Sequence, residues 1–349
     1  GDGSTLPFHI AGILFHGLCA LFVGVLAGRL SSRLFGIPPL CPAVIASLWF
    51  TALPLSAGVA VYIYSLSEII AAFFGLLLLW LASASERMRV FSYIWISALY
   101  VLALASKQSS IAIPAVVFLW DFFTLRRTQD IFKRWKLYVV LTGISLCYLL
   151  MRWWYFGTIG DLEAFNLFTV SIYSALQGIM YWKYLQFMFV PMNYSIDHGF
   201  SPQMFEVYQC VISWSLITLI LVTAVVWGRR SPVRRAFALG WFLFFFTLFP
   251  TSSFFPTTDL MAERRAYLAC AGLIMALAVL IVRLQKQYPY YKQLIATSLI
   301  AVFSFYSYSA YTRVIVYSDE VLLWQESIKL YPRNERAYIN LANEFLRTQ

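Results

Sequence analysis

The stretch from residue 250 to residue 268, PTSSFFPTTDLMAERRAYL, separates two strongly apolar runs with prolines, hydroxyl groups and charge. Asp259, Glu263, Arg264 and Arg265 lie within a few positions of one another there. An ionisable side chain inside a bilayer costs roughly 2.5 to 3.5 kcal/mol on insertion scales, so it usually faces a cavity, a partner or a ligand. Two explanations are open: Glu263 pairs with one arginine, or the arginines bind an anion. A guanidinium fits phosphate oxygens well, so our candidate anion is a lipid phosphate.

Composition fixes the class of protein. Of 349 residues, 61% are hydrophobic and only 12% are charged. This excludes a soluble globular domain and predicts an all-α polytopic membrane protein. The net charge of +10 does not indicate nucleic-acid binding, because the basic residues are spread over short loops between apolar runs.

Ten apolar runs are candidates for membrane spans, and we therefore expect a bundle of about ten transmembrane helices. Several runs are shorter than the roughly 20 residues that a straight span prefers, so their ends are approximate. The predicted spans are residues 8–28, 38–55, 67–84, 91–106, 109–125, 137–154, 206–228, 236–250, 266–283 and 293–311.

Basic residues occupy alternate loops, which identifies the cytoplasmic side by the positive-inside rule. They are Arg29, Arg33, Arg87, Arg89, Arg126, Arg127, Lys133, Arg134, Lys136, Arg229, Arg230, Arg234, Arg235, Arg283, Lys286 and Lys292. The stretch 250–268, the turn at Lys107 and the loop 155–204 then lie on the opposite face. This assignment requires that residues 169–190, which contain Gln177 and Lys183, form an interfacial or re-entrant helix.

The segment after the last span changes character. Residues 313–349 are charged and helix-patterned, with Trp324, Pro332, Ala337, Tyr338, Leu341, Ala342 and Phe345 at positions that resemble a tetratricopeptide repeat. We therefore divide the chain into a transmembrane domain, 1–312, and the start of a repeat region, 313–349. Such repeats need about three copies for stability, so we expect more of them after residue 349. The first residue is Gly1, which also suggests a piece of a longer protein.

The order of these parts resembles the transmembrane and tetratricopeptide-repeat-containing protein O-mannosyltransferases and their bacterial relatives, in the GT-C class of glycosyltransferases. The likeness covers nearly the whole chain. Its segments are residues 7–20 with His16, 56–74, 104–121 (LASKQSSIAIPAVVFLWD), 191–200 (PMNYSIDHGF), 250–267 with the acidic-Arg-x-x-Tyr pattern of Glu263, Arg264 and Tyr267, and the passage from Trp324 to Pro332.

This resemblance implies a GT-C-like bundle that transfers a sugar, with mannose as one candidate, from a polyprenyl-phosphate donor to Ser or Thr hydroxyls of proteins. Enzymes of this class carry their main catalytic Asp or Glu in a first outer loop. We expect that loop and the first span to precede residue 1. The implied partners are the bilayer, the lipid-linked sugar and an acceptor or partner protein held by the repeats.

Transfer from a lipid phosphate requires cations for the departing phosphate and a base near the acceptor oxygen. We assign Arg264, with Arg265 and Lys107 in support, to the donor phosphate. In the alternative interpretation, Lys107 binds no phosphate and only extends its amine to the membrane interface. Asp259 and Glu263 are the candidate catalytic carboxylates of this chain, Asp259 for positioning the acceptor and Glu263 for orienting Arg264.

Four further residues are weaker candidates for the site. Asp197 and His198 offer a base or a metal ligand, although a structural hydrogen bond is the favoured reading. Glu68 is either a site residue or a polar anchor at the start of a span. Tyr267 completes the acidic-Arg-x-x-Tyr pattern. No spacing supports a metal site, so a divalent metal stays an open but unsupported option, and no cofactor is assigned beyond the polyprenyl-phosphate sugar as donor substrate.

Two alternatives to a protein O-glycosyltransferase remain. One is a noncatalytic membrane scaffold that binds a partner through its repeats. Lys107-Gln108 in place of the family's Lys-Glu, and Leu66 before Ser67-Glu68 in place of Arg, favour this reading. The other is a lipid-linked glycan ligase or polymerase. For location we expect a bacterial inner membrane with the active face in the periplasm, or else the endoplasmic reticulum with the active face in the lumen.

Overall fold

The computed structural model describes residues 5–84, 89–125, 127–157, 167–253, 255–257 and 259–348. This part of the chain is helical and contains no strand. The α-helices are α1 (Leu6–Phe35), α2 (Leu40–Ala52), α3 (Pro54–Val61), α4 (Leu66–Ala82), α5 (Val90–Ser106), α6 (Ile113–Thr124), α7 (Thr128–Phe132), α8 (Trp135–Phe156), α9 (Leu167–Phe189), α10 (Val207–Gly228), α11 (Pro232–Leu248), α12 (Ala266–Gln287), α13 (Lys292–Tyr317), α14 (Glu320–Leu330) and α15 (Glu335–Thr348). The predicted all-α class is confirmed.

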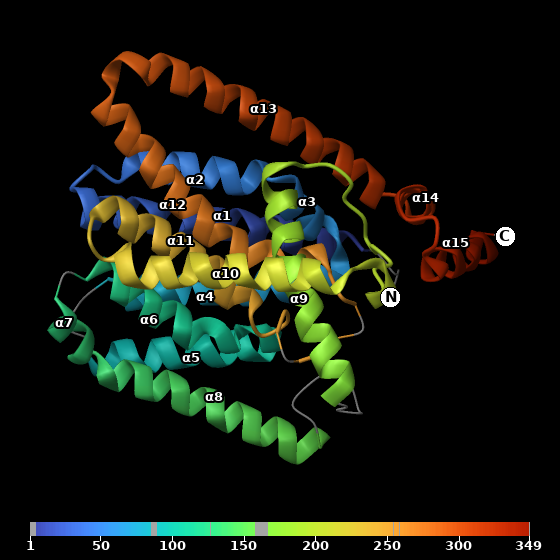
Figure 1. Cartoon of the computed structure of the whole chain (residues 1–349), viewed down its shortest axis with the longest axis horizontal. Helices are drawn as coiled ribbons and strands as arrows, with labels where there is room; N and C mark the ends of the chain where they lie inside the picture. The colour runs from blue at the N-terminus through green and yellow to red at the C-terminus, as the bar shows by residue number, and fades with distance from the viewer. Residues whose placement is uncertain are drawn as a thin grey trace.

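Most of the long helices run side by side, with α12 among the most enclosed (Figure 1). Small residues on the facing sides of α11 and α12 let the two helices approach closely, as is common between membrane helices. A Cβ added at Gly272 would lie 2.5 Å from the Cβ of Leu243, and one added at Gly240 would lie 2.7 Å from the Cβ of Ala276. The backbones of these two helices are therefore in near contact.

We expect Gly272→Ala to destabilise the protein, because the new methyl group has no room and α11 must shift. Overpacking of this kind costs roughly 1 to 3 kcal/mol. Gly143→Ala, on α8, is the matched control, since a Cβ there meets nothing within 4 Å. Thermal unfolding in detergent should show a lower midpoint for Gly272→Ala alone. Equal midpoints for the two variants would contradict the close approach.

Each of the ten predicted spans falls on helix in the structure. Among the described residues, six helices are long and apolar enough to cross a membrane, or seven if α2 and α3, which are bent by 60° at their break, form one span. Helices α5 and α6 are apolar but shorter, and α11 has 17 residues. The membrane class is thus supported, whereas the count of ten crossings stays a prediction.

The predicted basic loops gather at one end of the bundle, here called the basic end. Their arginines contact the ends of neighbouring helices: Arg33 donates to Thr124 Oγ1 at 3.3 Å, and Arg229 donates to the carbonyl of Leu125 at 3.4 Å. Arg134 pairs with buried Asp121 at 3.1 Å. Arg87 and Arg126 lie outside the described residues. The start of α1 and the helices α14 and α15 lie at the opposite end of the bundle, the outer end (Figure 1).

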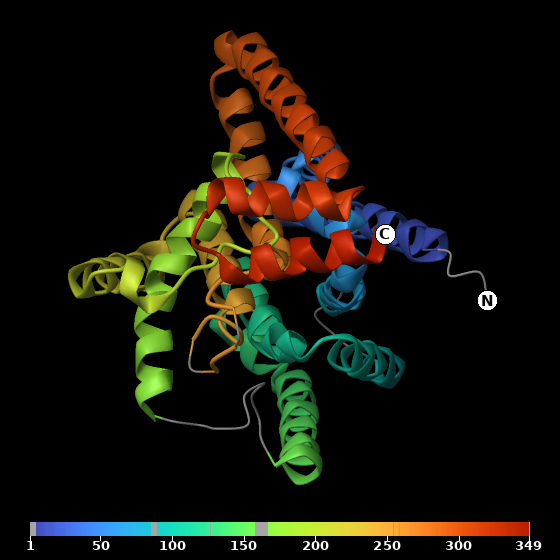
Figure 2. The ribbon, with the colours of Figure 1, turned by 90° about the vertical axis from the view of Figure 1, so that its right-hand side faces the viewer.

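Helix α9 crosses the outer end of the bundle instead of running along it (Figures 1 and 2). It is not among the six helices that satisfy the criteria for a span. It contacts the first turns of α10, where Trp214 Nε1 donates to the carbonyl of Ser174 at 3.0 Å. The interfacial or re-entrant position predicted for residues 169–190 stays a prediction.

The last three helices carry the chain from the bundle to its outer end. Helix α13 continues to Tyr317, so the domain boundary predicted at 312/313 falls inside it. Helices α14 and α15 then pack together across the outer end (Figure 2). Residues 313–349 therefore contain a helix pair, as expected for that segment; its membership in a tetratricopeptide repeat remains a prediction.

Candidate functional site

The stretch 250–268 is irregular in its described part until the short helix Glu263–Arg265, which leads into α12. Helix α9 supports it through side-chain hydrogen bonds to its main chain. Tyr173 donates to the carbonyl of Thr251 at 2.7 Å, Gln177 donates to the carbonyl of Leu260 at 3.0 Å, and Tyr184 donates to the carbonyl of Ala262 at 3.3 Å. Because these contacts are to main chain, α9 fixes the path of the stretch.

Arg264 and Arg265 lie at the outer end, as predicted, and both line a narrow cleft of about 30 Å³ between α4, α6 and α12. Arg265 donates to the carbonyl of Asp259 at 3.1 Å and to Thr257 Oγ1 at 2.8 Å. Arg264 Nη2 lies 3.5 Å from Asp259 Oδ2. Asp259 and Arg264 are therefore neighbours in space, with Arg265 holding the backbone beside them.

Glu68 reaches the same cleft from the other side, and Lys107 pairs with it. Glu68, in the first turn of α4, lines the cleft with Arg264 and Arg265. Lys107, just after α5, lies 3.2 Å from the Glu68 carboxylate. Lys107 is thus joined to the predicted cluster through Glu68. Tyr267 also lines the cleft, and its hydroxyl lies 2.8 Å from Nδ1 of His16 in the core.

Glu263 does not take the expected role beside Arg264. Its carboxylate accepts a hydrogen bond from the amide of Ser195 at 2.7 Å and lies 3.6 Å from Arg313 Nη2 on α13. His198 Nε2 is 3.2 Å away, within ion-pair distance but outside hydrogen-bond geometry. The side chain is 8% exposed. Glu263 therefore joins the loop after α9 to α13, away from the cleft.

Asp197 and His198 take the structural role that the sequence favoured. His198 Nδ1 lies 2.9 Å from the hydroxyl of Tyr331, which follows α14. Asp197 pairs with Arg336 of α15 and accepts a hydrogen bond from the amide of Gly199 at 3.0 Å. Burial acts to raise the pKa of Asp197, but these hydrogen bonds and the charge of Arg336 outweigh it, so the pKa falls below its ordinary value. Asp197 is thus held as a carboxylate that anchors α15.

A larger space, the outer cavity, lies between the bundle and the helix pair α14–α15. It has a volume of about 660 Å³ and is lined by Asp259 and Arg264, by Tyr62 and Tyr64 near α4, and by side chains of α14 and α15. Arg264 lines both this cavity and the narrow cleft. It therefore lies where the two spaces meet.

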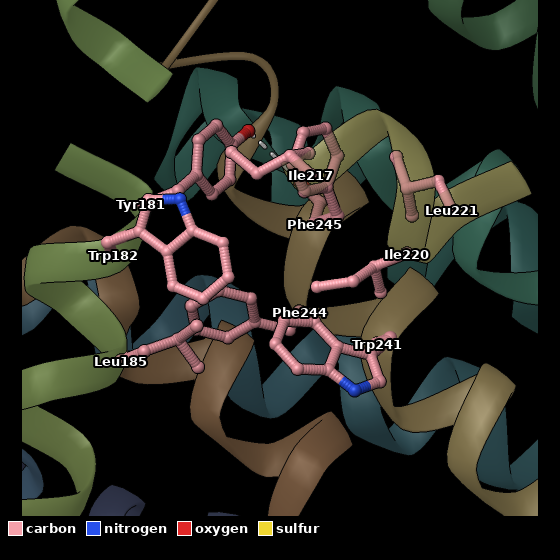
Figure 3. Close-up of a pocket in the computed structure, with 9 residues that line it drawn as sticks. All are labelled: Tyr181, Trp182, Leu185, Ile217, Ile220, Leu221, Trp241, Phe244 and Phe245. Carbon is pink, nitrogen blue, oxygen red and sulfur yellow. Dashed lines mark hydrogen bonds between the residues drawn. The ribbon is translucent and has the colours of Figure 1, made fainter. Parts of the chain in front are cut away.

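An aromatic pocket between α9, α10 and α11 is not part of this site. Tyr181, Trp182, Trp241, Phe244 and Phe245 enclose much of it (Figure 3). Its volume of about 10 Å³ is close to the minimum for one water molecule and is too small for a lipid chain. The stacked rings of Tyr181 and Phe245, 4.2 Å apart, indicate a packing contact between helices.

Comparison with known proteins adds one likeness. The chain is 23% identical, over 351 aligned positions, to a protein O-mannosyl-transferase of Caenorhabditis elegans. It resembles an O-mannosyl-transferase. The alignment covers 97% of this chain and 48% of the relative, so the chain spans about half the length of the curated relative that it matches. No family model matches the chain, and no solved structure matches it.

The likeness to the O-mannosyl-transferase covers nearly the whole chain, yet sequence reasoning missed two arginines that organise the outer end. Arg313 is 4% exposed and pairs with both Glu263 and Glu326. A single arginine just after an apolar span was a signal that could have identified it. Arg336 bridges Asp197 and Asp259, and no neighbouring residue in the sequence indicates this.

In the described part of the chain, no three His, Cys, Asp or Glu side chains are grouped as metal ligands.

Proposed function

We propose that this chain is the membrane part of a glycosyltransferase that moves a sugar from a polyprenyl phosphate to Ser or Thr hydroxyls of proteins. The observation that carries the proposal is the position of Arg264, between a cleft among transmembrane helices and an outer cavity. A lipid-linked donor needs such a place, because its chain stays in the bilayer while its headgroup meets a water-soluble acceptor. The name of the worm relative gives independent support for protein O-mannosylation.

Two arginines of the cleft and the neighbouring Asp259 divide the chemistry among them. The acceptor oxygen bonds to the anomeric carbon of the sugar, and the bond from that carbon to the phosphate oxygen breaks. The phosphate leaves with the bonding electrons, and the hydroxyl proton passes to a base. Arg264 and Arg265 stabilise the charge on the departing phosphate, and Asp259, 3.5 Å from Arg264, is the proposed base or acceptor-positioning group.

The direct test is transfer by the full-length protein in liposomes. The donor is a polyprenyl-phosphate mannose labelled in the sugar, and the acceptor is an unstructured peptide rich in serine and threonine. We expect label in the peptide, and none when a labelled nucleotide sugar replaces the lipid donor. Label in an added oligosaccharide instead of the peptide would indicate a glycan ligase. No label in either acceptor, from a folded protein, would contradict the proposal.

One observation favours the noncatalytic scaffold as a second candidate. Both carboxylate oxygens of Asp259 face arginines, since Oδ2 lies near Arg264 and Oδ1 lies 2.5 Å from Arg336 Nη2. A carboxylate held in this way has no oxygen turned toward an incoming acceptor hydroxyl. Catalysis through Asp259 therefore requires that Arg336 move away, and a scaffold has no such requirement.

A further inference from the structure

Two cavities lie on either side of Arg336 at the outer end. One is the outer cavity described above. The other, the loop cavity, has a volume of about 560 Å³ and lies against the loop 198–204, Met261 and the start of α15. Asp197, Asp259 and Arg336 line both cavities. These three side chains therefore form the wall between them.

The wall consists of one arginine spanning two carboxylates. Arg336 Nε lies 2.5 Å from Asp197 Oδ2, and its Nη2 lies 2.5 Å from Asp259 Oδ1. The Arg336 side chain is 51% exposed, so water is available to replace either contact. The carboxylates of Asp197 and Asp259 are only 9% and 18% exposed, so a group that displaces the arginine must satisfy them in its place. Arg336 is thus a water-accessible crossbar between two largely buried carboxylates.

We propose that the two cavities form one groove for an extended polypeptide, and that Arg336 is displaced when the polypeptide enters. The inference rests on the proposed function, because this polypeptide would be the acceptor. The two cavities together are far larger than a monosaccharide requires. Five carboxylates and four arginines line them, so neither a polyanion nor a polycation is favoured. Asn340 and Asn343 of α15 offer side-chain amides that match the donors and acceptors of a peptide backbone.

The position of the crossbar adds a chemical consequence. Displacing Arg336 frees Asp259 Oδ1, and Asp259 lies beside Arg264 at the mouth of the narrow cleft. A Ser or Thr hydroxyl carried past this point meets Asp259 on one side and the proposed donor phosphate on the other. Entry of the acceptor and release of the Asp259 carboxylate are therefore the same event.

The test uses the full-length protein in detergent, without donor, and a biotinylated peptide that alternates serine, threonine and alanine. A photoreactive phenylalanine analogue is placed at Asn343, in the outer cavity, or at Gln203, in the loop cavity. Gln325 on α14, exposed and outside both cavities, is the control position. We expect cross-linked peptide at Asn343 and Gln203, and background at Gln325. Cross-linking at one cavity alone, or at neither, would overturn the single groove.

Arg336→Ala tests the crossbar in the same assay. Removing the side chain that separates the two cavities should raise cross-linking at Gln203 roughly two- to tenfold. Lys329→Ala, which removes an exposed cation of α14 outside both cavities, should leave it unchanged. An unchanged or lower yield for Arg336→Ala, with α-helical content retained, argues against displacement. The cross-linking assay contains no donor, so its result does not depend on sugar transfer. Peptide cross-linking by a protein that transfers no sugar in the liposome assay would contradict the proposed function alone. Transfer without cross-linking at Gln203 would contradict the groove alone.

Discussion

Arg264→Ala is expected to reduce sugar transfer by roughly 10²- to 10³-fold, the usual effect of removing one preorganised group that stabilises charge in a transition state. Arg264 lines both the narrow cleft and the outer cavity, so its loss leaves the departing phosphate with Arg265 and with Lys107 beyond Glu68. The measurement is the initial rate of label transfer in liposomes, together with retention of the labelled donor by the purified variant.

Two controls separate chemistry from folding. Arg264→Lys keeps the positive charge but loses the forked donor geometry, so an intermediate rate is expected. Lys329→Ala removes a cation on the same face, outside the cleft, and should transfer at the wild-type rate. Arg264 is partly exposed, with 30% of its side chain accessible, so the alanine variant should unfold close to the wild-type temperature. Sugar transfer by Arg264→Ala at the wild-type rate would contradict the assignment of Arg264 to the donor site.

The sequence predicted those features of this protein that depend on local composition. Hydropathy identified the helices, and the alternation of basic loops placed the 250–268 stretch and Lys107 at the same end of the bundle. Arg264, Arg265 and Glu68 then meet in one cleft because the helices that carry them end at that face. Such predictions succeed because the bilayer imposes the same rule on every segment.

Features that depend on contacts distant in the chain were not predictable in this way. Glu263 is adjacent to Arg264 in sequence, but the short helix Glu263–Arg265 begins there and the Glu263 side chain faces Ser195 and Arg313 instead. The bend between α2 and α3 is a second example. It falls at Leu53-Pro54, inside a stretch that the sequence predicts as one continuous apolar span. In both cases tertiary packing selects one of several arrangements that the local sequence allows.

Glu263→Ala is expected to destabilise the outer end by about 3 to 5 kcal/mol, the usual cost of removing one partner from a buried ion pair. Arg313 is 4% exposed and would lose a carboxylate, and the amide of Ser195 would lose its acceptor. The loop after α9, α13 and α14 all meet at this group, so we expect them to loosen together. Thermal unfolding in detergent, and limited proteolysis of the 190–206 loop, measure the two effects.

Glu326→Ala is the matched control, because Glu326 pairs with the same arginine but has 32% of its side chain exposed. Water can replace that carboxylate, so its removal should cost about 1 kcal/mol or less. Glu263→Gln should fall between the two, since the amide oxygen can still accept from Ser195 while the charge is lost. If Glu263→Ala lowers transfer while the unfolding temperature and the protease pattern stay at wild-type values, Glu263 acts in the chemistry and not in the architecture. The arrangement of its partners, all on elements other than the cleft, makes the structural outcome the expected one.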